Sequence, residues 1–127
     1  MSMADLPKIL VVDDVRANLV GMRRLLAPVK AEIYEAHSGN EALALCLDHR
    51  FALILLDVQM PDMDGFEVAA LLNNDPATCD VPIVFVTAAY HDERRVWPGP
   101  LEPLRRAWWI NRARGLWLLR RLEKRLR

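Results

Sequence analysis

The chain has few cysteines and no long apolar run, and these absences exclude several classes of protein. Cys46 and Cys79 lie far apart, in no CxxC pair and no Cys/His cluster, so neither a disulfide framework nor a zinc site is indicated. No apolar stretch approaches the roughly 18 residues of a membrane span. The first residues lack the regions of a signal peptide, and no GxGxxG follows the first apolar run, which disfavours a dinucleotide-binding enzyme. We therefore expect a cytoplasmic protein.

Basic residues are scarce in most of the chain and crowded at its end. Residues 1–91 contain 6 Lys or Arg against 13 Asp or Glu, whereas residues 92–127 contain 11 against 4. All four Trp also lie in the second part. The formal net charge of +0 thus conceals an acidic part followed by a basic, tryptophan-rich part, a change of composition that is unusual within one fold.

Short apolar runs alternate with segments of helical periodicity, in a chain whose 127 residues fit a single domain over 1–127. The runs predict parallel strands at 8–12, 32–36, 51–56 and 81–86. The periodic segments predict helices at 15–27, 40–48 and 65–73, the second of them with Leu43, Leu45 and Leu47 available to pack. This alternation indicates an α/β fold, a doubly wound sheet with helices on both faces.

Acidic side chains stand where two of these strands end. Asp13 and Asp14 follow the first strand, and Asp57 follows the third, while Thr87 follows the fourth. Because the carboxyl ends of parallel strands share one edge of a sheet, these side chains are expected to converge. Clustered carboxylates repel one another, and Mg²⁺ would neutralise both them and an incoming phosphoryl group. The pattern therefore indicates phosphoryl transfer onto Asp57, giving an aspartyl phosphate.

Three separated segments carry this pattern: VVDD at 11–14, LLDVQMPDMDGFE at 55–67 and FVTAA at 85–89. In order and spacing they resemble the receiver domain of bacterial two-component response regulators. The resemblance covers residues 8 to about 95. It implies a CheY-like, flavodoxin-like fold with a five-stranded parallel sheet, and a signalling role as a phosphoacceptor switch.

The resemblance also implies roles for individual residues. Asp57 is the phosphoacceptor, and it holds Mg²⁺ together with Asp13 and Asp14 and the main-chain carbonyl of Gln59. Thr87 binds a phosphoryl oxygen and moves when the domain switches. A histidine kinase or phosphotransfer protein is the implied partner. The chain catalyses only its own phosphoryl transfer and dephosphorylation, so it is not expected to be an enzyme acting on other substrates.

The sequence departs from the family at the expected fifth strand. Receiver domains carry a Lys-Pro there, with the Lys paired to the phosphoryl group and an aromatic residue three positions before it. The nearest match is WWINRAR at 108–114, where Arg112 replaces the Lys and Trp109 is the switch aromatic. A guanidinium is a planar fork rather than a point charge. The alternative function is therefore a receiver-like binding scaffold that has lost switching because the Lys-Pro is absent.

Three explanations stay open for the divergent residues 96–127. They form a working fifth strand and last helix, or a specialised partner surface, or they are read in an altered frame relative to an ordinary receiver. Residues 114–127 place leucines at helical spacing with Arg and Lys opposite. This segment could cover the sheet, make a homodimer contact or lead into an output domain, and no motif in it supports direct nucleic-acid binding.

Overall fold

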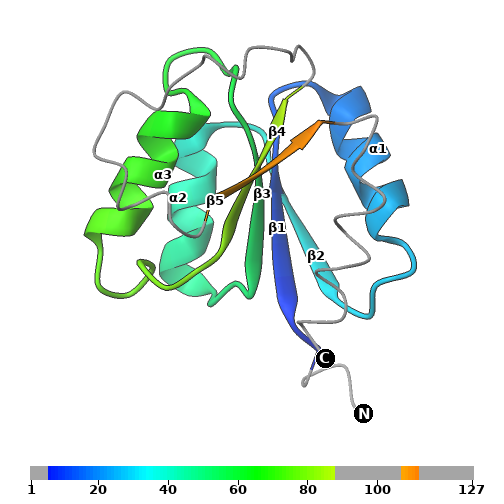
Figure 1. The fold of residues 1–127 in the computed structure, drawn as a ribbon, viewed down its shortest axis with the longest axis horizontal. Coiled ribbons are helices and arrows are strands. Elements are labelled where there is room, and N and C mark those ends of the chain that lie inside the picture. Colours follow the sequence, from blue (N-terminus) through cyan, green and yellow to red (C-terminus); the bar gives the residue numbers. More distant parts are fainter. Residues whose placement is uncertain (1–5, 88–106, 112–127) are drawn as a thin grey trace.

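A parallel sheet between two helical layers forms the core of the molecule (Figure 1), as shown by a computed structural model that describes residues 6–87 and 107–111. The strand order is β2-β1-β3-β4-β5. The strands are β1 (Lys8–Val12), β2 (Glu32–Ala36), β3 (Leu53–Asp57), β4 (Ile83–Thr87) and β5 (Ala107–Asn111). The helices are α1 (Arg16–Leu26), α2 (Gly39–Asp48) and α3 (Gly65–Asn74). In Figure 1, α1 covers one face of the sheet, and α2 and α3 cover the other.

Strands β1 to β4 confirm the predicted parallel α/β sheet. Each neighbouring pair among them is parallel, and β1 lies between β2 and β3. The helices that connect these strands return the chain across opposite faces, as doubly wound sheets require. Strand β3 begins at Leu53, later than predicted, and it includes Asp57 as its last residue.

Side chains of the central strands divide between two buried clusters, one on each face. The cluster under α2 and α3 contains Leu10, Val12, Ile54, Leu56, Ile83 and Phe85. The cluster under α1 contains Ile9, Val11, Leu53, Leu55, Val84 and Val86. Because helices cover both faces, these strands are continuous apolar runs rather than alternating ones.

Helix α2 shows where the helical pattern misled. Its buried face is centred on Gly39, Ala42 and the partly buried Cys46, which follow one another at helical spacing. Leu47 was predicted to pack, but that prediction was wrong, since its side chain is 83% exposed. It lies one residue past Cys46 and is therefore rotated by about 100° around the helix axis. Among the described helices, none is both long and apolar enough to cross a bilayer.

The two cysteines differ in burial, which predicts a difference in reactivity. Burial raises the pKa of the Cys46 thiol from 9.0 to about 11, whereas Cys79 is exposed. Since the thiolate is the nucleophile, Cys46 should have about a hundredfold less of it than an ordinary thiol near neutral pH. The raised pKa stabilises the fold below pH 9 and this contribution is lost as the pH rises toward 11.

We therefore expect iodoacetamide to modify Cys79 rapidly and Cys46 slowly in the native chain. Mass spectrometry of the Cys46→Ser and Cys79→Ser variants measures each rate alone. Urea should bring the two rates together, because unfolding removes the burial of Cys46. Equal rates in the native chain would contradict the burial of Cys46.

Candidate metal centre

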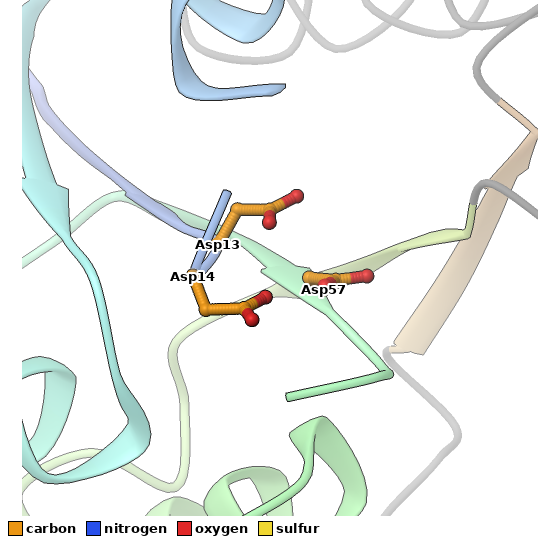
Figure 2. Close-up of side chains that lie close together, drawn as sticks. All are labelled: Asp13, Asp14 and Asp57. Atoms are coloured by element: carbon orange, nitrogen blue, oxygen red, sulfur yellow. The ribbon is translucent and has the colours of Figure 1, made fainter. Parts of the chain in front are cut away.

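Three carboxylates gather at the carboxyl end of the sheet (Figure 2). Asp13 and Asp14 directly follow β1, and Asp57 ends β3. One oxygen from each carboxylate lies within 4.8 Å of the others. Asp13 and Asp57 are buried, with 0% and 6% of their surfaces exposed, whereas Asp14 is exposed. The sheet therefore brings together the three acids that the sequence pattern singled out.

Pairing of β1 with its neighbours sets the position of Asp13. In the register of β1 and β3, Val12 is paired with Leu56. The next residue of each strand, Asp13 and Asp57, therefore lies at the same height along the sheet. The backbone N–H of Asp13 also donates to the carbonyl of Ala36 in β2, at 3.1 Å. Asp13 is thus held by the sheet itself rather than by a free loop.

The side chain of Asp13 is oriented by the beginning of α1. Its Oδ1 accepts a hydrogen bond from the backbone N–H of Val15 at 2.9 Å. The same oxygen accepts a second hydrogen bond from Nδ2 of Asn18 at 3.3 Å. The sequence pattern did not single out Asn18, although an Asn in the first turn of the helix that follows an acid pair was an available signal.

The acids that follow Asp57 have a structural role in the loop before α3. The side chain of Asp64 accepts a hydrogen bond from the N–H of Glu67 at 2.9 Å. The Glu67 side chain accepts one from the N–H of Asp64 at 3.1 Å, which completes a capping box. Asp62 is exposed and has φ of 68°, a left-handed conformation in which Asp is tolerated better than most residues. Asp62 therefore forms part of the loop turn, and Asp64 is the residue that caps the start of α3.

Gly65 lets the start of α3 approach the end of β3. Its N–H donates to the carbonyl of Val58 at 2.9 Å. A Cβ at this position would lie 2.2 Å from the backbone oxygen of Asp57, which is far inside van der Waals contact. Only glycine fits here without a shift of the backbone that carries the carboxylate.

Gln59 lies in the same loop, two residues after Asp57. It is exposed, and it lines an open pocket of about 500 Å³ together with Val58, Met60, Asp64 and Phe66. A main-chain carbonyl in this loop is a hard oxygen donor of the kind that Mg²⁺ accepts.

Thr87 lies on the strand next to Asp57. In the register of β3 and β4, Asp57 is paired with Val86, so Thr87 stands one residue further toward the carboxyl end. The two residues therefore leave neighbouring strands at the same edge of the sheet, as the sequence pattern predicted.

Strand β5 pairs in parallel with β4 along the other edge of β4. Trp109 pairs with Phe85, and Asn111 pairs with Thr87. Arg112, predicted to replace the family's Lys, lies outside the described residues.

The donor set of the acid cluster fits a hard divalent cation. Two charges 4 Å apart repel by about 1 kcal/mol in water and about 4 kcal/mol at an effective dielectric constant of 20. Carboxylate oxygens are ligands that Mg²⁺ prefers, and the ion usually combines one or two carboxylates with waters. The oxygens of Asp13, Asp14 and Asp57, which lie within 4.8 Å of one another, therefore offer a donor set of the kind that this ion takes.

Fold and site together define a class: a doubly wound α/β domain with an acidic pocket where β1 and β3 end. Residues 9–96 match the family described as the response regulator receiver domain. The chain belongs to this family, as the sequence motifs predicted, and it has the signalling role of a receiver domain.

Relatives of known sequence support this membership. Response regulator PleD of Caulobacter vibrioides is 48% identical over 84 residues, which are 64% of this chain and 18% of PleD. The polar-differentiation response regulator DivK of Brucella anthropi is 35% identical over 100 residues, 76% of this chain and 81% of DivK. The chain thus spans less than a fifth of the length of PleD but most of the length of DivK.

Solved structures confirm the CheY-like fold. Response regulator protein TrrA of Thermotoga maritima, crystallised in complex with Mg²⁺-BeF, has a TM-score of 0.77 and 26% identity over 96% of this chain and 100% of TrrA. The chemotaxis response regulator CheY4 of Vibrio cholerae has a TM-score of 0.76 and 27% identity over 92% of this chain and 98% of CheY4.

Proposed function

We propose that the chain, as one receiver domain over 1–127, is a phosphoacceptor switch modified on Asp57 by a partner histidine kinase or phosphotransfer protein. The observation that carries the proposal is the convergence of Asp13, Asp14 and Asp57 to within 4.8 Å at the end of the sheet. Membership of the receiver family and the likeness to TrrA, crystallised with Mg²⁺-BeF, support it further.

Asp13, Asp14, Asp57 and the main-chain carbonyl of Gln59 would hold Mg²⁺. When bound, the ion offsets the negative charge of the carboxylates and of the phosphoryl oxygens. Asp13 is held by the sheet and by α1, so it keeps its position while a phosphoryl group approaches. The exposure of Asp14 gives a hydrated cation and a donor access to the site from solvent.

The transfer itself joins a carboxylate nucleophile to the phosphorus of an in-line donor. An oxygen of Asp57 forms a bond to phosphorus, while the bond from phosphorus to the donor's imidazole nitrogen breaks and leaves its electron pair on that nitrogen. The hydroxyl of Thr87 would donate to a phosphoryl oxygen. Attack of water on phosphorus later releases inorganic phosphate and restores the Asp57 carboxylate.

Two further roles lie in the last part of the chain. Arg112 would supply the positive charge that the family obtains from its Lys, and Trp109 on β5 would be the aromatic residue that moves with Thr87. The distinction from a scaffold that does not switch depends on these residues, because a switch must favour a second conformation once Asp57 is modified.

Incubation of the chain with acetyl phosphate tests the proposal. We expect mass spectrometry to show a gain of one phosphoryl group with Mg²⁺ and no gain with excess EDTA, because the carboxylates alone repel the donor. A gain that is equal with and without Mg²⁺ would refute the metal's role. Phosphorylation that leaves hydrogen exchange in β4 and β5 unchanged would favour the scaffold instead.

A further inference from the structure

The carboxylate of Asp13 is tied to α1 by two hydrogen bonds that share one oxygen. The N–H of Val15 and the side-chain amide of Asn18 both donate to Oδ1, at 2.9 and 3.3 Å. Asp13 is completely buried, and Asn18 is partly buried beside it. Rotation of the carboxylate about its side-chain bonds would therefore break both contacts, which costs free energy.

We infer that Asn18 is a positioning residue for the metal centre, an inference that rests on the proposed function. Without an ion, the carboxylates of Asp13, Asp14 and Asp57 repel, and the favoured response is to rotate apart. The amide of Asn18 opposes that rotation because it donates to a fixed oxygen of Asp13. The ion then meets a carboxylate that is already ordered, so less of its binding free energy is spent on ordering it.

A purely structural role for Asn18 is the competing explanation. Val15 makes no side-chain cap at the start of α1, and the first turn of this helix has no acidic residue. The side chain of Asp13 accepts a hydrogen bond from the N–H of Val15, the N-cap residue of α1. Its contact with Asn18 also ties the end of β1 to α1. A structural contact of this kind would change the melting temperature without metal, whereas a positioning contact would change the affinity for the metal.

Metal titration of the full chain separates these explanations. Binding of Mn²⁺ is followed by the electron paramagnetic resonance signal of the free ion, and Mg²⁺ is then added as a competitor. We expect Asn18→Ala and Asn18→Leu to weaken binding about tenfold, the lower part of the range for residues that orient a metal ligand. Asn18→Gln keeps an amide donor, so it should recover affinity to within about twofold of the unsubstituted chain.

Two reference variants give the metal affinities against which the Asn18 variants are compared. Asn40→Ala makes the same change at an exposed site in the first turn of α2, and its affinity should equal that of the unsubstituted chain. Asp14→Ala removes a charged oxygen ligand and should bind far more weakly than Asn18→Ala. Melting temperatures measured in EDTA report any loss of fold stability separately.

Unchanged metal affinity in Asn18→Ala would overturn the inference, whatever its melting temperature, while leaving the metal centre intact. Equal weakening in Asn18→Gln and Asn18→Leu would also overturn it, because the amide donor would then be irrelevant. Failure of the unsubstituted chain to bind either ion is a different outcome, since it would refute the proposed function and the inference with it.

Discussion

Replacing Asp57 with Asn is expected to abolish phosphorylation of the chain by acetyl phosphate and Mg²⁺. The amide has nearly the shape of the carboxylate, but it lacks the negative charge that makes the oxygen a nucleophile. Asp57 ends β3 and is buried in the acid cluster, so the substitution removes the carboxylate at this place in the sheet and leaves Asp13 and Asp14 as they are. Mass spectrometry should show the gain of a phosphoryl group in the unsubstituted chain and no gain in Asp57→Asn.

Asp62→Asn is the matched control. It removes one carboxylate from the loop after β3 at an exposed position with φ of 68°, a conformation that Asn adopts readily. We expect its phosphorylation to equal that of the unsubstituted chain. A phosphoryl group retained by Asp57→Asn and mapped to another residue would refute the assignment of Asp57.

Replacing Gly65 with Ala should destabilise the fold and disturb the site together. The added Cβ would lie 2.2 Å from the backbone oxygen of Asp57 and 3.0 Å from Cα of Val58. Both obstacles are backbone atoms, so either α3 or the end of β3 must shift. We expect the free energy of unfolding to fall by about 2–3 kcal/mol in urea denaturation, the range for overpacking that the backbone must absorb. The displaced Asp57 should also accept a phosphoryl group more slowly.

Gly21→Ala provides the opposite control. A Cβ at Gly21, in the middle of α1, would meet no atom within 4 Å. Since alanine is the better helix former, this variant should be more stable by about 0.5–1 kcal/mol and should keep its phosphorylation rate. Equal stabilities for Gly65→Ala and the unsubstituted chain would mean that α3 does not approach β3 as closely as described.

The acid cluster was predictable because its position depends on topology more than on detail. Asp13 and Asp57 each stand directly after an apolar run, and parallel strands bring such positions to one edge. Because β1 and β3 are neighbours in the sheet, Asp13 and Asp57 lie close together although they are far apart in the sequence. Thr87 follows the same logic on β4, since the register of β3 and β4 places it one residue past the partner of Asp57.

Residues that act through packing were harder to predict. Asn18 is in hydrogen-bond contact with Asp13 because α1 begins close to the end of β1; its place in the first turn was visible in the sequence, but the contact itself was not. The exposure of Leu47 has a similar cause, since the buried face of α2 is centred on Gly39, Ala42 and Cys46. The spacing of the leucines did not distinguish Leu47, which is exposed, from Leu43 and Leu45, which pack against the core.

The last part of the chain departs from its family in composition. The match to the receiver family ends at residue 96, close to the point where Arg and Trp become frequent. Strand β5 pairs with β4 at 107–111, yet the family's Lys-Pro is absent from the sequence. Sequencing the coding DNA around residue 96 would separate an altered reading frame from a divergent fifth strand.

The amino-acid order by itself determined the alternation of strands and helices, the parallel sheet and the three acids at its edge. These depend on local periodicity and on the rule that parallel strands end together. Tertiary structure alone decided which hydrogen bonds orient Asp13, how closely α3 approaches Asp57 at Gly65, and which face of α2 is buried. The reason is physical: each of these features depends on distances of a few ångströms between particular atoms, and only close packing in the folded chain sets such distances.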